Sequence, residues 1–385
     1  MNEKNQGITI CSVGDLMICD SPLYASVGVG SKYKTIRDKL FCNCNDIFND
    51  ADIVIGNFET VVYKPKSKSL KEMQMRCPES VVKDLKKAGF SILNIANNHC
   101  MQHGTEGFQK TRNILEKCGI KPIGIRDENP YMITVSGVEL AFLSLCIHLE
   151  WYEPEHILYE NRIERILREV KDLRQKDPDM IIAVSVHWGD EFAAYPSNAQ
   201  VALAHKLVDL GANIVLGHHS HVFQGIEEYK GAVVVYGQGN FVSDMVPEIC
   251  KQTGIVKVEI DEKRNITYDI IPFFINNDYV PAQTDLEWFQ ERQSALQGVL
   301  AGKYTDDDYW NNISVGHAAS HNAFKTFFRK NIMKYRMGIS LKMIYDFIIR
   351  KTRRIIGTTT DGRVSSMDPA IIEAINNYDH IQMPN

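Results

Sequence analysis

Three histidines crowd into four positions directly after an apolar run of the chain. His218, His219 and His221 follow the segment GANIVLG, which ends at residue 217. Imidazole nitrogens bind divalent transition metals, and imidazoles also act as general acids and bases. A single histidine beside an apolar run is more often a hydrogen-bonded structural residue. The chemical meaning of this cluster therefore depends on which residues follow the other apolar runs.

Polar side chains of a similar kind follow four further apolar runs. In sequence order these residues are Asp15, Asn57, Glu59, Asn98, His99 and His187. Carboxylate, amide oxygen and imidazole together form a mixed oxygen and nitrogen ligand set, which suits Mn, Fe or Zn rather than a thiolate site. Each residue alone could be a turn or a helix cap. That explanation would have to hold at five strand ends at once, so the pattern favours a divalent-metal site.

The elements that must position these residues are short buried strands alternating with helices. Apolar runs typical of strands covered on both faces occupy residues 7–13, 51–55, 90–95, 140–146, 180–186, 214–216 and 232–236. Amphipathic patterns at residues 78–88, 107–118, 161–176 and 198–210 predict helices between them. This alternation predicts an α/β fold, in which functional side chains gather at the carboxyl ends of the strands.

The pattern changes in the last third of the chain. Residues 254–274 alternate between apolar and polar side chains and predict an antiparallel pair of strands. Helical patterns follow at residues 285–300, 324–354 and 369–377. We therefore expect a main domain over residues 1–282 and a helical, partly basic extension over residues 283–385.

Taken together, the motifs over residues 7–280 resemble those of the poly-γ-glutamate capsule-synthesis (CapA-type) family, which is similar to the calcineurin-like metallophosphoesterases. The matching motifs are GDLM at 14–17, NFE at 57–59, ANNH at 96–99, HWGDE at 187–191, GHHSH at 217–221 and YGQGNF at 236–241. The resemblance implies a metallophosphoesterase-like four-layer αββα sandwich with an α-helical C-terminal extension.

The resemblance also implies roles for individual residues and for two divalent metal ions (Mn, Fe or Zn). The implied metal ligands are Asp15, Glu59, Asn98, His187, His219 and His221. His99 is implied as the group that protonates the leaving oxygen. Supporting or substrate contacts are expected from Asn57, His103, Glu191, His218 and Asn240. Apart from the resemblance, Arg76 is a candidate to hold a substrate anion, or it forms a surface salt bridge.

Two positions depart from the pattern of related proteins. Ordinary metallophosphoesterases carry a histidine two residues after the first aspartate, where this chain has Met17. A thioether is a poor ligand for hard cations, so one metal lacks a ligand. The family usually has an aspartate shortly after the ANNH motif, where this chain has Gln102. The neighbouring His103 is a candidate to replace part of that function.

Two functions of different classes remain open at this point. The first is a metal-dependent hydrolase of phosphate esters or of a related anionic small molecule or polymer, associated with capsule or exopolymer synthesis. The alternative is a non-catalytic, metal-containing subunit that binds the polymer or supports assembly. Met17 favours the alternative, and the retained pair Asn98 and His99 favours the enzyme. A nucleotide-binding fold is not supported, because no glycine-rich loop follows the first strand.

Composition sets further expectations about compartment and partners. The net charge of −5 argues against a nucleic-acid-binding protein. We expect a cytoplasmic protein with reduced thiols, because the N-terminus lacks the pattern of a signal peptide and the nine cysteines are scattered. Residues 322–356 are rich in Lys, Arg and aromatic side chains. They could contact an anionic inner-membrane surface or an acidic polymer, or they could pack their aromatic side chains on the core. The sequence predicts no oligomeric state.

Overall fold

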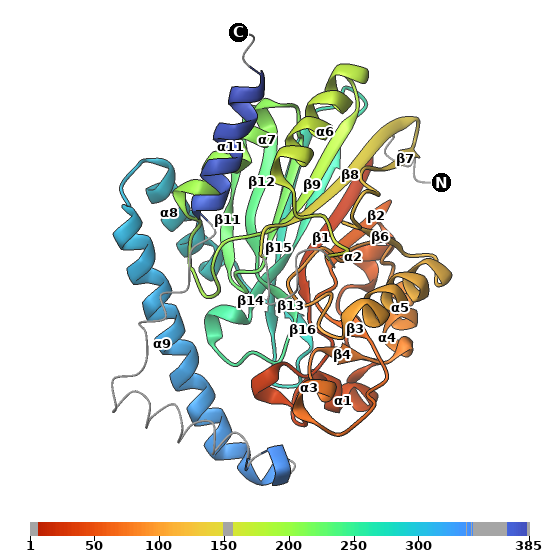
Figure 1. Ribbon diagram of the computed structural model, residues 1–385, viewed down its shortest axis with the longest axis vertical. Coiled ribbons are helices and arrows are strands. Elements are labelled where there is room, and N and C mark those ends of the chain that lie inside the picture. The colour runs from red at the N-terminus through yellow and green to blue at the C-terminus, as the bar shows by residue number, and fades with distance from the viewer. Residues whose placement is uncertain (1–6, 149–156, 336, 340, 342–367, 383–385) are drawn as a thin grey trace.

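Two β-sheets lie face to face in the centre of the molecule (Figure 1). The structure is a computed structural model and describes residues 7–148, 157–335, 337–339, 341 and 368–382. Within those residues the larger sheet has the order β16-β15-β14-β1-β2-β5-β6, and β13 also pairs with β1. Its strands are β1 (Ile8–Leu16), β2 (Ile53–Asn57), β5 (Ile92–Asn94), β6 (Lys121–Ile123), β13 (Asn240–Val242), β14 (Gln252–Ile260), β15 (Ile266–Ile275) and β16 (Pro281–Gln283).

The second sheet has the order β11-β12-β10-β9-β8-β7 in the described part of the chain. Its central strands β8, β9, β10 and β12 run parallel, and β7 and β11 flank them antiparallel. A small separate sheet consists of β3 (Val61–Val62) and β4 (Arg76–Cys77). The strands of the second sheet are β7 (Tyr131–Val135), β8 (Val138–Cys146), β9 (Ile181–His187), β10 (Ile214–His218), β11 (Phe223–Tyr229) and β12 (Ala232–Gln238).

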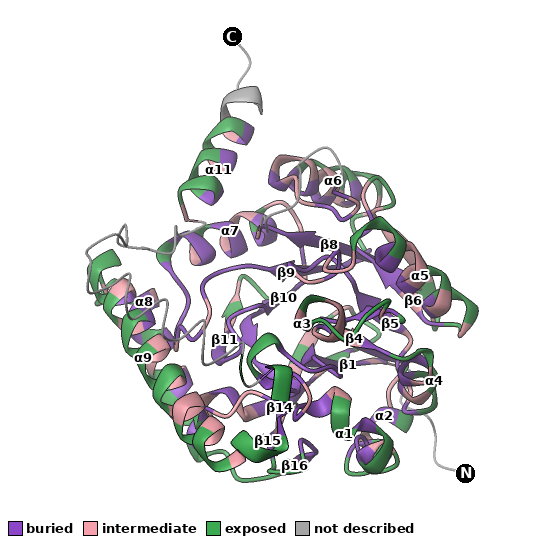
Figure 2. Cartoon of the chain, turned by 60° about the horizontal axis from the view of Figure 1, so that its bottom comes forward, coloured by how far each residue is buried: buried purple, intermediate pink, exposed green. Residues whose placement is uncertain are grey.

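Apolar side chains fill the space between the two sheets and the space between each sheet and its helices. Ile10 and Ile55 of the first sheet belong to the same buried cluster as Phe142 and Val235 of the second. Figure 2 shows this buried interior with exposed helix faces around it. The first sheet is covered by α1 (Val29–Ile36), α2 (Asn45–Asn49), α4 (Glu79–Lys87) and α5 (Gly104–Lys117), and the second by α6 (Ile163–Lys176) and α7 (Asn198–Asp209). The expected four-layer αββα sandwich is therefore confirmed.

Local sequence explains where the covering helices begin. Helix α7 starts at a capping box, in which the Ser197 hydroxyl accepts the backbone N–H of Gln200 at 3.1 Å. The Gln200 side chain in turn accepts the backbone N–H of Ser197 at 3.0 Å. Helix α4 follows Pro78 and buries Val81, Val82 and Leu85 against the sheet. The short remaining elements of the main domain are a 3₁₀ turn at Pro22–Tyr24, α3 (Leu70–Met73) and a 3₁₀ turn at Glu248–Cys250.

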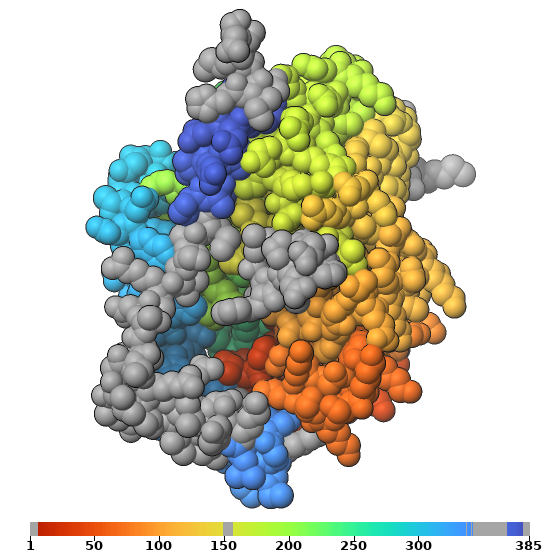
Figure 3. All heavy atoms as spheres, in the orientation of Figure 1, coloured from red at the N-terminus to blue at the C-terminus, as the bar shows by residue number. Residues whose placement is uncertain are grey.

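The C-terminal helices pack on the sandwich. Helix α8 (Glu287–Leu300) lies against β11 and buries Trp288 and Leu296. Helix α11 (Asp368–Gln382) contacts α6 and α7, as the dark-blue surface in Figure 3 shows. The boundary between residues 282 and 283 stays a prediction.

Helix α9 (Asp306–Asn331) runs along one side of the molecule and enters the basic segment that the sequence singles out. It ends inside that segment, and a 3₁₀ turn follows at Ile332–Lys334. Phe324 and Phe327 pack edge-on against Tyr24, with ring centroids 5.5 and 5.3 Å apart. Most of the segment beyond Tyr335 lies outside the described residues, so membrane contact through 322–356 stays a prediction. Among the described helices, none combines the length and the apolar character needed to cross a membrane.

A buried carboxylate ties the loop after β1 to the loop after β13. Asp244 is fully buried and accepts hydrogen bonds from the backbone N–H and the hydroxyl of Ser21. Burial and the nearby carboxylate of Asp20 raise the pKa of Asp244 to about 7. An unfolded aspartate has a pKa of about 3.9. The folded state therefore binds more protons between pH 4 and pH 7, and the free energy of unfolding falls as pH rises through that range.

We expect Asp244→Asn to stabilise the protein more at pH 8 than at pH 5. The amide keeps the shape of the side chain and can still bond with Ser21, but it carries no buried charge. The expected difference between the two pH values is about 1–3 kcal/mol in the free energy of unfolding, measured by urea denaturation. The exposed Asp38→Asn serves as control. An equal effect of Asp244→Asn at both pH values would contradict this account.

Candidate metal centre

The carboxyl ends of parallel strands bring the predicted residues to one edge of the molecule. Asp15 on β1 is directly opposite Asn57 on β2. His187, the last residue of β9, is directly opposite His218, the last residue of β10. Because the two sheets are stacked, side chains from both of them meet at this edge.

Three buried side chains form the centre of the cluster. Asp15, Glu59 and His187 each offer one ligand atom, and these three atoms all lie within 4.8 Å of one another. All three residues are 0% exposed. Within the described residues, Asp15 Oδ2 and Glu59 Oε1 have no hydrogen-bond partner. Buried carboxylate oxygens without donors are costly, so these residues fit a bound divalent cation.

The other predicted ligands surround these three residues. His219 Nδ1 lies 3.1 Å from His187 Nε2, and Asn98 Oδ1 lies 3.0 Å from the same nitrogen. His221 Nδ1 lies 3.3 Å from Asp15 Oδ2. The structure thus brings all six predicted ligands together, although their coordination of a metal stays a prediction.

The electrostatics of the cluster leave the two innermost imidazoles neutral. Burial holds the pKa of His187 well below its usual value. Burial, together with the neighbouring histidines His148 and His187, has the same effect on the pKa of His219. Neutral imidazole is the form that binds metals, so both rings are ready to act as ligands.

Burial and neighbouring charges shift the pKa values of the two carboxylic acids and of His221. Burial and the charge of Asp15 raise the pKa of Glu59 well above its usual value. Burial alone would also raise the pKa of Asp15, but His218 and His221 lower it below its usual range. Burial would lower the pKa of His221, yet Glu59 and Asp15 raise it to about 10. Two buried acids thus require nearby positive charge, which a divalent cation would also provide.

Asn57 holds the two carboxylates in place. Its Nδ2 donates to Asp15 Oδ1 at 2.8 Å and to Glu59 Oε2 at 3.4 Å. Its Oδ1 accepts from the side-chain amides of Asn94 at 3.0 Å and of Asn97 at 3.2 Å. Two donors on the oxygen fix the amide so that its nitrogen faces the carboxylates. The sequence analysis did not identify these functions of Asn94 and Asn97.

Two of the three histidines that follow β10 have unusual backbone conformations. The φ angles are +93° at His219 and +57° at His221, in the region that favours glycine. Such conformations are concentrated at functional sites, where the surrounding structure maintains them. Asn240 supports His221 through a contact of 3.0 Å between Oδ1 and Nδ1. His218 Nδ1 lies 3.3 Å from Asp15 Oδ1, and its supporting role stays a prediction.

His99 lies at the rim of the cluster, with 16% of its side chain exposed. Its Nε2 is 3.9 Å from Glu59 Oε1, and its Nδ1 is 3.1 Å from Gln102 Oε1. Gln102 stands where the family usually has an aspartate, and it contacts the His99 ring. His103, the other candidate for part of that function, bonds to the carbonyl of Gln74 at 2.9 Å and stacks on Tyr63.

The remaining predicted residues lie farther out. Arg76 is half-buried on β4, its Nη2 lies 3.6 Å from the sulfur of Met73, and its Nε has no hydrogen-bond partner within the described residues. A half-buried guanidinium of this kind can hold a substrate anion. The charge of Glu191 contributes to the raised pKa values of Glu59 and His221, so it acts on the cluster from nearby.

His148 is a member of the cluster that the sequence analysis missed. Its ring packs on His219 with centroids 3.7 Å apart, and its Nε2 lies 2.7 Å from the carbonyl oxygen of Gly189. It follows β8 by two residues, so the strand-end criterion that found the other residues could have found it too.

Met17 is 1% exposed, and it packs in a small apolar cluster with Cys19 and Met75. Its sulfur lies 3.6 Å from the hydroxyl of Ser243. The position where ordinary metallophosphoesterases carry a histidine is therefore part of the apolar packing beside the site.

The comparison with known proteins agrees with the motifs. A family model described as "Bacterial capsule synthesis protein PGA_cap" matches residues 9–245, which is more than half of the 385 residues. The chain belongs to the CapA-type family of bacterial capsule-synthesis proteins. The resemblance inferred from the motifs is thereby confirmed.

Individual members of the CapA-type family match most of the chain. "Capsule biosynthesis protein CapA" of Bacillus anthracis is 28% identical over 290 residues, covering 71% of this chain and 69% of that protein. "PGA biosynthesis protein CapA" of Bacillus subtilis (strain 168) is 30% identical over 255 residues, covering 62% of this chain and 66% of that protein. The matched region thus spans about two thirds of each relative.

A solved structure of a 5'-nucleotidase from Candida albicans SC5314 aligns with 83% of this chain and 59% of its own chain, at 11% identity. The TM-score is 0.40, which is too low to support an inference about either fold or activity.

Proposed function

We propose that this protein is a metal-dependent hydrolase of phosphate esters or a related anionic substrate, acting in capsule or exopolymer synthesis of the poly-γ-glutamate type. The observation that supports this proposal most directly is the approach of Asp15, Glu59 and His187 at the edge of the sheets, where one oxygen of each carboxylate forms no hydrogen bond within the described residues. The family and the names of its members support this biological setting.

Different residues of this chain would have different roles in such a reaction. Divalent ions held by Asp15, Glu59 and His187 would neutralise the charge of a phosphoryl group and activate water. Asn57 donates hydrogen bonds to both carboxylates and would orient them toward the ions. His99, at the more exposed rim, is positioned to donate a proton to the leaving oxygen, and Gln102 orients its ring.

His99→Ala tests the catalytic part of this proposal. We expect metal content to remain nearly unchanged while hydrolysis falls at least tenfold, because general acid catalysis contributes about 10²–10⁴-fold. Metal content is measured by elemental analysis, and hydrolysis with the most active substrate of a phosphoester panel in the presence of added manganese. The matched control is His205→Ala, which removes an imidazole that pairs with Glu227 on the second sheet. Activity equal to the wild type in His99→Ala would exclude His99 from the mechanism.

A second candidate function is a non-catalytic subunit that keeps the metal site for structure or for binding an anionic polymer. The buried, apolar surroundings of Met17 favour it, because they leave the centre without the histidine of ordinary metallophosphoesterases. The phosphoester panel separates the two functions. Bound metal with manganese-dependent turnover supports the hydrolase, and bound metal without turnover on any phosphoester supports the binding subunit.

A further inference from the structure

A pocket of about 400 Å³ lies between the loop before α1, the chain around the 3₁₀ turn at Glu248–Cys250, the β15–β16 turn and the end of α9. Three lysines line it, Lys32, Lys251 and Lys334. Its other polar and aromatic lining comes from Ser26, Ser31, Asn277, Asn331, Tyr279 and Phe327. No aspartate or glutamate is among the described residues that line this pocket, which we call the lysine pocket.

The positive charge of the lysine pocket has little compensation. Within the described part of the chain, none of its three lysines is within 4 Å of a carboxylate oxygen. Lys251 is half-buried, and its Nζ lies 3.4 Å from Asn277 Oδ1. Burial lowers the pKa of Lys251, which the charge of Glu248 only partly offsets. Lys32 stands over the ring of Tyr279 at 4.6 Å. Lys251 is the half-buried member of the three, and Lys32 and Lys334 are exposed. Three cations around one pocket that no described carboxylate lines favour an anionic ligand.

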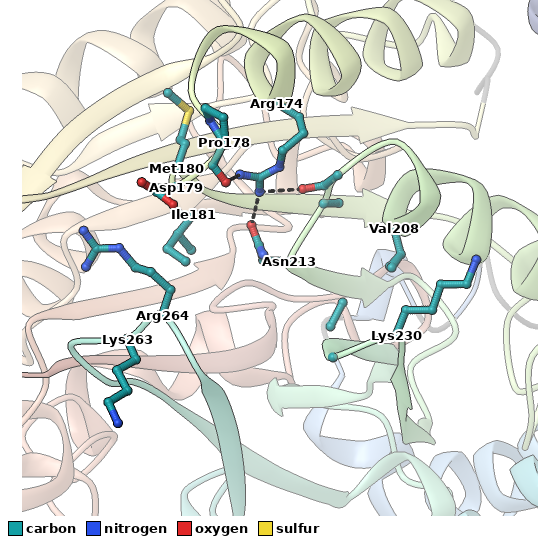
Figure 4. A pocket seen from close by; sticks show the side chains of 14 residues that line it. Arg174, Pro178, Asp179, Met180, Ile181, Val208, Asn213, Lys230, Lys263 and Arg264 are labelled. Carbon is teal, nitrogen blue, oxygen red and sulfur yellow. Dashed lines mark hydrogen bonds between the residues drawn. The ribbon is translucent and has the colours of Figure 1, made fainter.

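A second basic pocket, at the opposite ends of the strands, provides a contrast (Figure 4). Its Arg174 donates to the carbonyl oxygens of Pro178 and Gly211 and to Asn213 Oδ1. Its Lys230 forms an ion pair with Asp209 at 2.6 Å. Arg174 and Lys230 thus already have partners within the protein, whereas the three lysines of the lysine pocket form no ion pair within the described residues.

We propose that the lysine pocket binds an oxyanion group, a carboxylate or a phosphate, of a small molecule or of a polymer segment. Ammonium groups suit this chemistry because they attract oxyanions without requiring one planar geometry. Asn277 and Asn331 also line the pocket, where Asn331 Nδ2 donates to the carbonyl oxygen of Phe327 at 2.9 Å, and Phe327 adds an apolar side chain. The volume exceeds that of a single oxyanion, so the ligand has room for a carbon skeleton.

The lysine pocket adjoins the wall of the metal centre. Met245 lines the pocket, and its sulfur lies 3.7 Å from Asn240 Nδ2. Asn240 in turn contacts His221. One methionine side chain and one asparagine therefore separate the pocket from a predicted metal ligand.

Isothermal titration calorimetry of the full chain tests this proposal, with pyrophosphate and a γ-linked glutamate trimer as separate probes. We expect at least one probe to bind, and Lys251→Met to weaken its binding at least tenfold, because methionine keeps the apolar stem without the charge. Lys32→Met, at the exposed side of the pocket, is expected to weaken binding less. The matched control Lys230→Met removes a charge from the second pocket and should leave the affinity unchanged.

The two probes identify the chemical class of the ligand, since binding of pyrophosphate alone indicates a phosphate site and binding of the trimer alone a carboxylate site. Circular dichroism confirms that each variant is folded. Absence of binding by both probes would overturn the proposal. An affinity that is the same in Lys251→Met and in the wild type would also overturn it, because the probe would then bind elsewhere.

Discussion

Asp15→Asn should weaken manganese binding by more than about 100-fold and reduce hydrolysis to background. The substitution keeps the shape of a fully buried side chain but removes the charge that lies beside Glu59 and His187. Loss of residues that only support a ligand typically costs 10–100-fold in metal affinity. Loss of a charged ligand should cost more. Calorimetric titration with manganese measures the affinity, and the phosphoester assay measures turnover.

The matched control for this prediction is Asp20→Asn, at another buried aspartate of the loop after β1. Asp20 binds Ser26 and Ser31 and is not part of the metal cluster. We expect Asp20→Asn to change stability but to leave the manganese affinity within about threefold of the wild type. Equal manganese affinity in Asp15→Asn and the wild type would show that the carboxylate of Asp15 is not a ligand.

Gly14→Ala should lower the free energy of unfolding by about 3 kcal/mol or more. A Cβ at this position would lie 2.1 Å from the carbonyl oxygen of Gly239 and 2.7 Å from that of Gln238. Both contacts are with backbone atoms of the segment that joins β12 to β13, so no flexible side chain can move aside. Overpacking of this kind typically costs 1–3 kcal/mol and occasionally more. The displaced backbone would also carry Asp15 away from its partners.

Chemical denaturation measures the stability of this variant, and manganese titration measures the effect on the site. Gly338→Ala is the control, because a Cβ there would meet nothing within 4 Å. We expect its free energy of unfolding to stay within about 0.5 kcal/mol of the wild type. A Gly14→Ala protein as stable as the wild type would show that β1 and the β12–β13 segment are farther apart than in the structure.

The sequence was enough to predict that the metal cluster lies at the carboxyl edge of the sheets, because the end of a parallel strand has a predictable place in a sheet. A residue directly after a buried parallel strand must lie at the carboxyl edge of its sheet. Asp15 and His187 lie at the ends of β1 and β9, Glu59 follows β2 by two residues, and the structure brings the three within reach of one another. The rule also applies to His148, which we overlooked because the apolar run ends at Cys146, two residues earlier.

Other features depend on contacts that a linear sequence does not specify. The amides of Asn94 and Asn97 converge on Asn57 only after β2 and β5 pair. The lysine pocket joins segments more than 300 residues apart, from Ser26 to Lys334. Helix α9 starts at Asp306 after a capping box between Thr305 and Asp308, but its helical face is weakly amphipathic, and we predicted no helix between residues 300 and 324.

The most direct test of the metal centre is anomalous X-ray diffraction from crystals of the wild-type protein grown with manganese. We predict at least one anomalous peak within about 2.0–2.3 Å of a carboxylate oxygen of Asp15 or Glu59 and of a His187 ring nitrogen. Crystals of Asp15→Asn should lack that peak. A well-resolved wild-type map with no manganese beside these residues, or with manganese bound only elsewhere, would contradict the account.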